Sequence, residues 1–292
     1  MKRLGVVGLG LVVGCASTSV LEPPRARLGV QSNEVAVGAV ALRFEPSVGT
    51  RFRTSLAIEI TAQLMGQSMQ LSGVYEDERE ILERRPDGTT VMASRTTGRS
   101  YRIALGDMPA RDEPIEPSAR PTTSVLDARG RSIDDAMFGP EVPGGSTERS
   151  ALLRGVLDPL LDALAYPERP VEPGGHWEGM GTRTLPEGGT LRYELTQTLV
   201  RIEGSGASAV AVIAVRGRLD GSGFSGGGPS SGELRIDGVY TVGVTDGLVR
   251  AMQSRIDGRV AIGGGPSPRG RALPGQGGLD VPFEGTIRYR AE

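Results

Sequence analysis

Few residues of this 292-residue chain have the types and spacing that catalysis requires. His176 is the only histidine, and it lies between Gly175 and Trp177 with no second metal ligand at a helical or Cys-x-x-Cys spacing. A catalytic triad or a histidine-rich zinc site would have to use His176 itself. The sequence therefore favours a structural role for His176, as a loop residue at the entrance of a strand.

Three other stretches resemble ligand sites in composition alone. The glycines and serines of 226–231 are not followed by the Gly-Lys-Ser/Thr of a phosphate-binding loop. The pair Asp134-Asp135 and the acidic residues of 76–80 lack the glycine and distal glutamate of a calcium loop. We therefore expect no metal, no cofactor and no enzymatic activity. A hydrolase is the least favoured alternative, since the fold and not the sequence sets the spacing of paired carboxylates.

Cys15 is the only cysteine, and the residues before it form a distinctive leader. Lys2 and Arg3 precede an uncharged apolar run, Leu4 to Gly14, that ends directly before the thiol. This run is too short for a spanning helix, which needs ~20 apolar residues. An ordinary cleaved signal peptide is the other alternative. The pattern resembles the lipobox of bacterial lipoproteins, which implies cleavage before Cys15 and a diacylglycerol on its thiol.

The lipobox resemblance divides the chain into three parts. Residues 1–14 would be the signal peptide, residues 15–34 a flexible tether, and residues 35–292 a single β-rich domain. Ala16 stands where an aspartate would favour the inner membrane, so the resemblance implies the outer membrane of a double-membraned cell. We expect a protein of the cell envelope, anchored to the membrane by lipid and facing the periplasm.

Composition narrows the class of partner. The 33 basic and 35 acidic residues give a formal net charge of −2, so no basic surface for nucleic acid is expected. Aromatic residues make up only 4% of the chain, which argues against base stacking and against a sugar-binding cleft. A single cysteine allows no internal disulfide, so the domain must be stabilised by its hydrophobic core.

Alternating apolar and polar residues predict long strands. From Arg51 to Leu64 the apolar side chains share one parity, as in a strand with one covered face. Turn signals at 66–68 and 86–88 extend this strand into an antiparallel meander. Pro282 suggests an edge position for the last strand, at least at that residue. The later strands are expected at 191–196, 207–215, 234–244, 248–262 and 279–289, with a hairpin turn at Asp246-Gly247.

The segment Thr147 to Ala165 carries the main helical signal. Its leucines and valines recur at a spacing near four, which makes one apolar stripe, and Pro159 predicts a kink. Such a stripe must be covered, and the sheet is its only large partner. The expected fold is therefore α+β and mostly β: a curved antiparallel sheet, or half-open barrel, packed on one leucine-rich helix. A two-sheet sandwich with the helix outside is the alternative.

A short motif follows the expected helix. The segment 170–177 reads Pro-Val-Glu-Pro-Gly-Gly-His-Trp and precedes the strand at 191–196. Through Pro-Val-x-x-Gly-x-x-Trp it resembles a family of uncharacterised bacterial lipoproteins. More distantly, it is similar to the periplasmic lipoprotein carriers and their outer-membrane receptor, in which a curved antiparallel sheet wraps around helices and shelters acyl chains. The resemblance supplies no catalytic residues.

This architecture implies a binding protein. A curved sheet closed by a leucine-rich helix would enclose an apolar cavity, and such clefts are common ligand sites. We expect the protein to bind a lipid or another hydrophobic molecule, or to present its sheet to an envelope protein. The alternative is a solid domain that works only through its surface and its anchor. The side chains expected to line the cavity are Tyr75, Tyr193, Tyr240 and Met252.

Overall fold

The structure, a computed structural model, describes residues 38–64, 66–106, 110–115, 121–133, 165–184, 190–222, 230–262 and 279–292. All of them belong to one compact unit, Val37–Glu292. The expected signal peptide, Cys15 and the tether over 15–34 lie outside the described residues.

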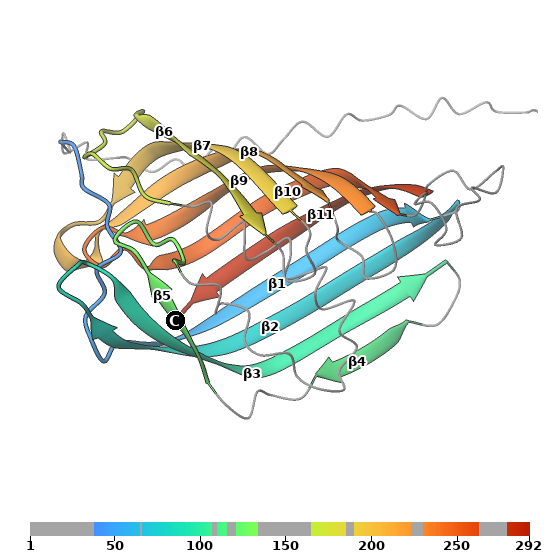
Figure 1. The fold of residues 1–292 in the computed structure, drawn as a ribbon, viewed down its shortest axis with the longest axis horizontal. Helices are drawn as coiled ribbons and strands as arrows, with labels where there is room; N and C mark the ends of the chain where they lie inside the picture. Colours follow the sequence, from blue (N-terminus) through green and yellow to red (C-terminus); the bar gives the residue numbers. More distant parts are fainter. Residues whose placement is uncertain are drawn as a thin grey trace, which may run out of the picture. The chain divides into compact units, whose positions relative to one another are not determined.

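In these described ranges, eleven strands form a single antiparallel sheet (Figure 1). From one edge to the other, the order is β4, β3, β2, β1, β11, β10, β9, β8, β7 and β6, and β5 pairs with β3. Because β4 and β6 end this order, the sheet is open. The strands are β1 (Arg51–Leu64), β2 (Gln67–Arg84), β3 (Thr90–Leu105), β4 (Arg111–Ile115), β5 (Thr122–Leu126), β6 (His176–Thr184), β7 (Thr190–Glu203), β8 (Val210–Ser222), β9 (Ser230–Gly243), β10 (Val249–Ile262) and β11 (Leu279–Ala291).

The α+β class expected from the sequence is wrong, because the described part of the protein is all-β. Its only helical element is a three-residue 3-10 turn, Gly206–Ser208, and no described helix packs on the sheet. The helical pattern over Thr147–Ala165 lies, except for Ala165, outside the described residues. A spacing near four within one segment does not determine the fold class, which in the described residues follows from the pairing of long strands. The expected antiparallel sheet and its open edges are confirmed.

Local sequence accounts for the strand ends. Asp87 closes the turn between β2 and β3 because its Oδ1 accepts the Thr89 N–H at 2.9 Å. The hydrogen bonds that the Thr89 N–H and hydroxyl donate to the exposed Asp87 carboxyl hold its pKa below the usual value. Asp246 closes the turn between β9 and β10 in the same way, because its Oδ1 accepts the Leu248 N–H at 3.0 Å. Gly247 follows it with a φ of +67°, a conformation that glycine tolerates best.

The edge position predicted at Pro282 holds for that residue but not for the strand as a whole. Pro282 lies in β11, which pairs with β10 on one side and with β1 on the other. The ladder between β1 and β11 stops at the pair Ala62 and Phe283, one residue before the proline. Pro282 therefore interrupts no pairing with β1, and a central strand tolerates it there.

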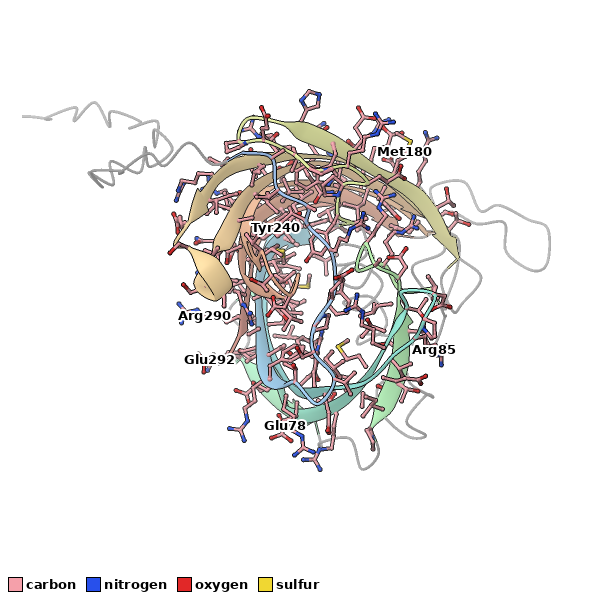
Figure 2. All side chains as sticks on the ribbon, turned by 90° about the vertical axis from the view of Figure 1, so that its left-hand side faces the viewer. Glu78, Arg85, Met180, Tyr240, Arg290 and Glu292 are labelled. Atoms are coloured by element: carbon pink, nitrogen blue, oxygen red, sulfur yellow. The ribbon has the colours of Figure 1, made fainter. Side chains whose placement is uncertain are left out.

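The sheet is strongly curved, and its two faces differ in chemistry (Figure 2). Tyr240 lies inside the curve, whereas Glu78 and Arg290 point outward. Cross-strand ion pairs cover the convex face, as the alternation predicted. Examples are Arg51–Glu80 at 2.9 Å, Arg95–Glu78 at 2.8 Å and Arg218–Glu194 at 3.1 Å.

Connecting segments cross one end of the curved sheet, which we call the capped end. The segments 38–47, 127–133 and 165–175 are hydrogen-bonded to one another there. Of these, 127–133 follows β5 and 165–175 precedes β6. Leu42, Phe44 and Tyr166 bring apolar side chains from these segments into the core. The backbone hydrogen bonds that hold the cap include Val40 N–H to Val171 O (2.9 Å), Phe44 N–H to Ala128 O (2.9 Å) and Tyr166 N–H to Arg129 O (3.0 Å).

Candidate functional site

The concave face has two parts, and the first is a sealed apolar wall. Inward-facing residues of β7 to β10 pair across the strands, so that Met252 faces Tyr240 and Tyr240 faces Ile213. We call this wall the sealed arm. Its members are at most 3% exposed: Leu195, Leu199, Ile213, Val215, Ile236, Tyr240 and Met252.

Hydrogen bonds tie the sealed arm to the cap. The carbonyl oxygen of Ala165 accepts the Trp177 Nε1–H at 2.9 Å and the Gln197 Nε2–H at 3.3 Å. Tyr240 donates its hydroxyl to Gln197 Oε1, and Tyr166 donates to the Gly247 carbonyl at 2.5 Å. Burial raises the pKa of both tyrosines, so each hydroxyl stays protonated as a donor. This arm is a fixed, fully packed core.

The second part is the concave face of β1, β2 and β3, which we call the open arm. Apolar side chains of β1 and β2 face each other there, with Leu56 opposite Tyr75 and Ile60 opposite Leu71. All four are only half-buried, although they contact the core. We call them the apolar stripe: Leu56, Ile60, Leu71 and Tyr75.

Towards the capped end, the open arm becomes polar. Asp77 of β2 faces Thr54 of β1 and Thr96 of β3, and Arg79 faces Ser94 of β3. Arg79 Nη2 lies 3.5 Å from Asp77 Oδ2, with the two side chains 17% and 23% exposed. We call these residues the polar patch: Thr54, Asp77, Arg79, Ser94 and Thr96. It continues the apolar stripe along β2.

The structure brings only two of the four sequence-predicted site residues together. Tyr240 and Met252 are adjacent in the sealed arm, at 0% and 3% exposure. Tyr75 is half-buried in the open arm. Tyr193 is half-buried on β7, where its ring lies against Gly181 of β6 and takes the space that a Cβ there would need. All four face the concave side.

Sequence reasoning missed Asp77 and Arg79, although a signal for them exists. The strand β2 carries Met69, Leu71, Tyr75 and Ile81 at odd positions, and these two charged residues occupy the same parity. A charge on the apolar parity of a strand indicates a polar group facing inward. The adjacent Glu78, on the other parity, pairs outward with Arg53 and Arg95, which confirms this orientation.

The convex face carries a shallow groove of about 610 Å³ over β1, β9, β10 and β11. Its lining is largely charged, and Arg235 and Arg259 contact Glu233 and Asp280 there. Exposed ion pairs of this kind are ordinary on a solvated sheet. We therefore place the candidate site on the concave face.

Other site classes find little support in the described ranges. No group of three or more His, Cys, Asp or Glu side chains in those ranges is placed to hold a metal ion. His176 is an exposed residue at the start of β6. Within the same part of the chain, no helix has the length and apolar character to cross a membrane.

Comparison with known proteins places the chain in no family. No protein-family model and no curated protein matches the sequence. Among solved structures, lipovitellin, studied for its lipid–protein interactions, shares 13% identity over 85% of this chain and 25% of that chain, with a TM-score of 0.45. This chain thus spans about a quarter of that structure's length.

Two bacterial structures are less similar still. The β domain of the Bordetella autotransporter BrkA shares 10% identity over 82% of this chain and 98% of that chain, at a TM-score of 0.21. OccK5 (OpdH) of Pseudomonas aeruginosa shares 8% identity over 84% and 98%, at the same TM-score. Likenesses at these TM-scores define neither the fold nor the function of this protein.

Proposed function

We propose that this protein is a lipid-anchored protein of the cell envelope that binds a hydrophobic molecule and has no catalytic role. The observation that supports binding is the apolar stripe. Leu56, Ile60, Leu71 and Tyr75 stay partly exposed on a concave surface, around the buried Ile58. Partly exposed apolar side chains in a concave setting are typical of ligand sites, because a bound apolar group removes them from water.

The ligand approaches the concave face. The convex face is charged and favours contact with water. The apolar side chains of the sealed arm are buried and therefore not accessible to a ligand. Tyr75 contacts the ligand directly, and Tyr193 contributes from the opposite arm. Tyr240 and Met252 support the site from within the packed wall.

The stripe is tested by a matched pair of substitutions on β2. Leu71→Asn places an amide in the stripe. Val74→Asn also replaces an apolar side chain with an amide, but on the convex face, where Val74 is 38% exposed. The measurements are displacement of the neutral dye Nile red by dodecanoic acid, and mass spectrometry of lipids extracted from the purified full-length chain. We expect Leu71→Asn to weaken binding roughly tenfold or more, since burying an unpaired amide is costly, and Val74→Asn to leave it unchanged.

The same experiment distinguishes the rival functions. Absence of extracted lipid and of saturable dye binding would contradict the proposal and favour a domain that works through its surface. Ester hydrolysis abolished by a single substitution would favour an enzyme instead.

The anchor is a separate part of the proposal, and it is supported by the sequence before Cys15. Expressed with its leader in a double-membraned bacterium, the protein should partition into detergent and float with outer membranes. Cys15→Ser should release it into the soluble fraction, because the thiol that carries the lipid is lost. Detergent partitioning that survives this substitution would overturn the anchor and leave the ligand site untouched.

A further inference from the structure

The polar patch is an unusual feature of the concave face, since it places charge inside the curve of the sheet. Its orientation follows from its neighbours. Glu78 pairs with Arg53 at 3.1 Å and with Arg95 at 2.8 Å on the convex face. Asp77 and Arg79 flank Glu78 on an alternating strand, so both face inward.

A β-bulge in β3 determines which residues of that strand lie opposite Asp77 and Arg79. The register between β2 and β3 shifts by one residue between Glu76 and Asp77, which leaves Thr97 as the extra residue. Beyond the bulge, Thr96 faces Asp77 and Ser94 faces Arg79. Short polar side chains therefore flank Asp77 on both neighbouring strands, whereas Arg79 has Ser94 on β3 and the ring of Phe52 on β1.

Arg79 has more hydrogen-bonding capacity than its surroundings use. Its side chain is 17% exposed, and its one ion pair, from Nη2 to Asp77, is long at 3.5 Å. The Nε–H is fully buried and has no acceptor in the described part of the chain. A buried donor without a partner is costly, so this group favours an acceptor supplied from outside the chain.

The polar patch and the apolar stripe lie on one track. Leu71, Tyr75, Asp77 and Arg79 all face inward from β2, over nine residues that span roughly 27 Å of strand. The track is apolar at one end, and at the other it carries an ion pair with an unused N–H donor. Burial raises the pKa of the Tyr289 hydroxyl, while the charges of Arg79 and Asp77 act on it in opposite directions.

We propose that the ligand is an anionic amphiphile, whose head group accepts the Arg79 Nε–H at the polar patch while its tail lies along the apolar stripe. This inference rests on the proposed function, because it names the class of ligand that the stripe takes. A carboxylate fits the site better than an amine, since Asp77 is already paired and Arg79 offers the unused donor. A guanidinium binds oxyanions with directed hydrogen bonds.

The test compares head groups on one tail. Dodecanoic acid, dodecan-1-ol and dodecylamine each compete with Nile red for the purified full-length chain, below their micelle-forming concentrations. We expect the acid to bind roughly tenfold more tightly than the alcohol, as for a charge-assisted hydrogen bond, and the amine to bind most weakly.

Substitutions test whether Arg79 causes the preference for the acid over the alcohol. Arg79→Met keeps the length and apolar stem of the side chain and should bring acid and alcohol to equal affinity. Arg53→Met is the matched control, because Arg53 lies on the convex face of β1 and should leave the preference intact. Should Arg79→Met fail to fold, as judged by circular dichroism, the wild-type order of head groups still decides the proposal, and Arg79→Lys should retain only part of the preference.

Each outcome has a distinct meaning. Equal affinity for acid and alcohol in the wild type, or a preference that survives Arg79→Met, overturns the head-group site while the hydrophobic site stands. A preference for the amine assigns recognition to Asp77 and also overturns it. Failure of every amphiphile to displace the dye contradicts the proposed function itself.

Discussion

The sealed arm and the open arm are built from the same kind of strand, yet their inner faces differ. In the sealed arm, Ile213 and Tyr240 are fully buried, and the cap is hydrogen-bonded to its polar atoms. In the open arm, Ile60 and Tyr75 keep part of their surface exposed, and the ion pair of Asp77 and Arg79 follows them. One arm therefore supplies stability, and the other keeps surface available for a ligand.

The largest expected effect compares one isoleucine from each arm. Ile213→Ala should destabilise the fold by about 2–5 kcal/mol, because it leaves a cavity in a packed wall. Ile60→Ala should cost about half of that or less, since its side chain is already partly exposed. Urea denaturation of both variants measures the difference. Equal losses of stability would show that the two arms are packed alike.

A second comparison uses glycines. A Cβ on Gly217, in β8, would overlap the carbonyl oxygen of Glu194 on the neighbouring strand. Gly217→Ala should therefore cost about 1–3 kcal/mol by overpacking. At Gly98, in β3, the nearest atom to a Cβ is the Glu76 Oε2 at 2.7 Å, the end of a flexible side chain. Gly98→Ala should change stability by about 0.5 kcal/mol or less, and an effect as large as at Gly217 would show that the convex face of β3 is packed as tightly as the concave face of β8.

The buried tyrosines predict how stability depends on alkaline pH. Burial raises the pKa of Tyr166 and of Tyr240, whereas tyrosines in the unfolded chain ionise near pH 10. Their contribution is present in full below about pH 10 and is lost as the pH rises towards the folded-state pKa. The urea concentration at the unfolding midpoint should decrease as the pH rises above about 10. This decrease should be shallower in Tyr240→Phe. A decrease of unchanged steepness in Tyr240→Phe would contradict this assignment.

The smallest effect is expected on the convex face. Arg95 and Arg53 hold the pKa of the Glu78 carboxyl below its usual value by hydrogen bonds, but these arginine side chains are well exposed, at 54% and 80%. Salt screens such pairs, and holding long side chains in place costs entropy. Glu78→Gln should leave the thermal midpoint at neutral pH unchanged within error. A drop comparable to that of Ile213→Ala would mean that the charged ladder, and not the sealed arm, stabilises the sheet.

Much of the sheet could be predicted from sequence, because alternation and turn chemistry are local. The parity of β1 and the turns at Asp87 and Asp246 are where the sequence places them. The central position of β11, in contrast, could not be predicted. Its neighbour β1 lies more than 200 residues earlier in the chain, and no local pattern reveals that β1 and β11 pair.

The candidate site was harder to predict for a related reason. Alternation shows that Tyr75 and Tyr240 face the same side, but it does not show which one the cap covers. That difference arises when segments from distant parts of the chain meet at the capped end. The polar patch, in contrast, was visible as two charges on the apolar parity of β2, and this signal applies to other curved sheets.

The account depends most on where an apolar ligand lies, and photo-crosslinking measures this directly. A dodecanoic acid analogue with a diazirine in its tail is bound to the full-length chain, activated by light, and its adducts are mapped by peptide mass spectrometry. Adducts should concentrate on inward residues of β1 and β2, around Leu56, Ile60 and Leu71, and should be displaced by unlabelled dodecanoic acid. Adducts confined to the convex face or to β8 and β9, or insensitive to the competitor, would contradict a ligand site on the open arm.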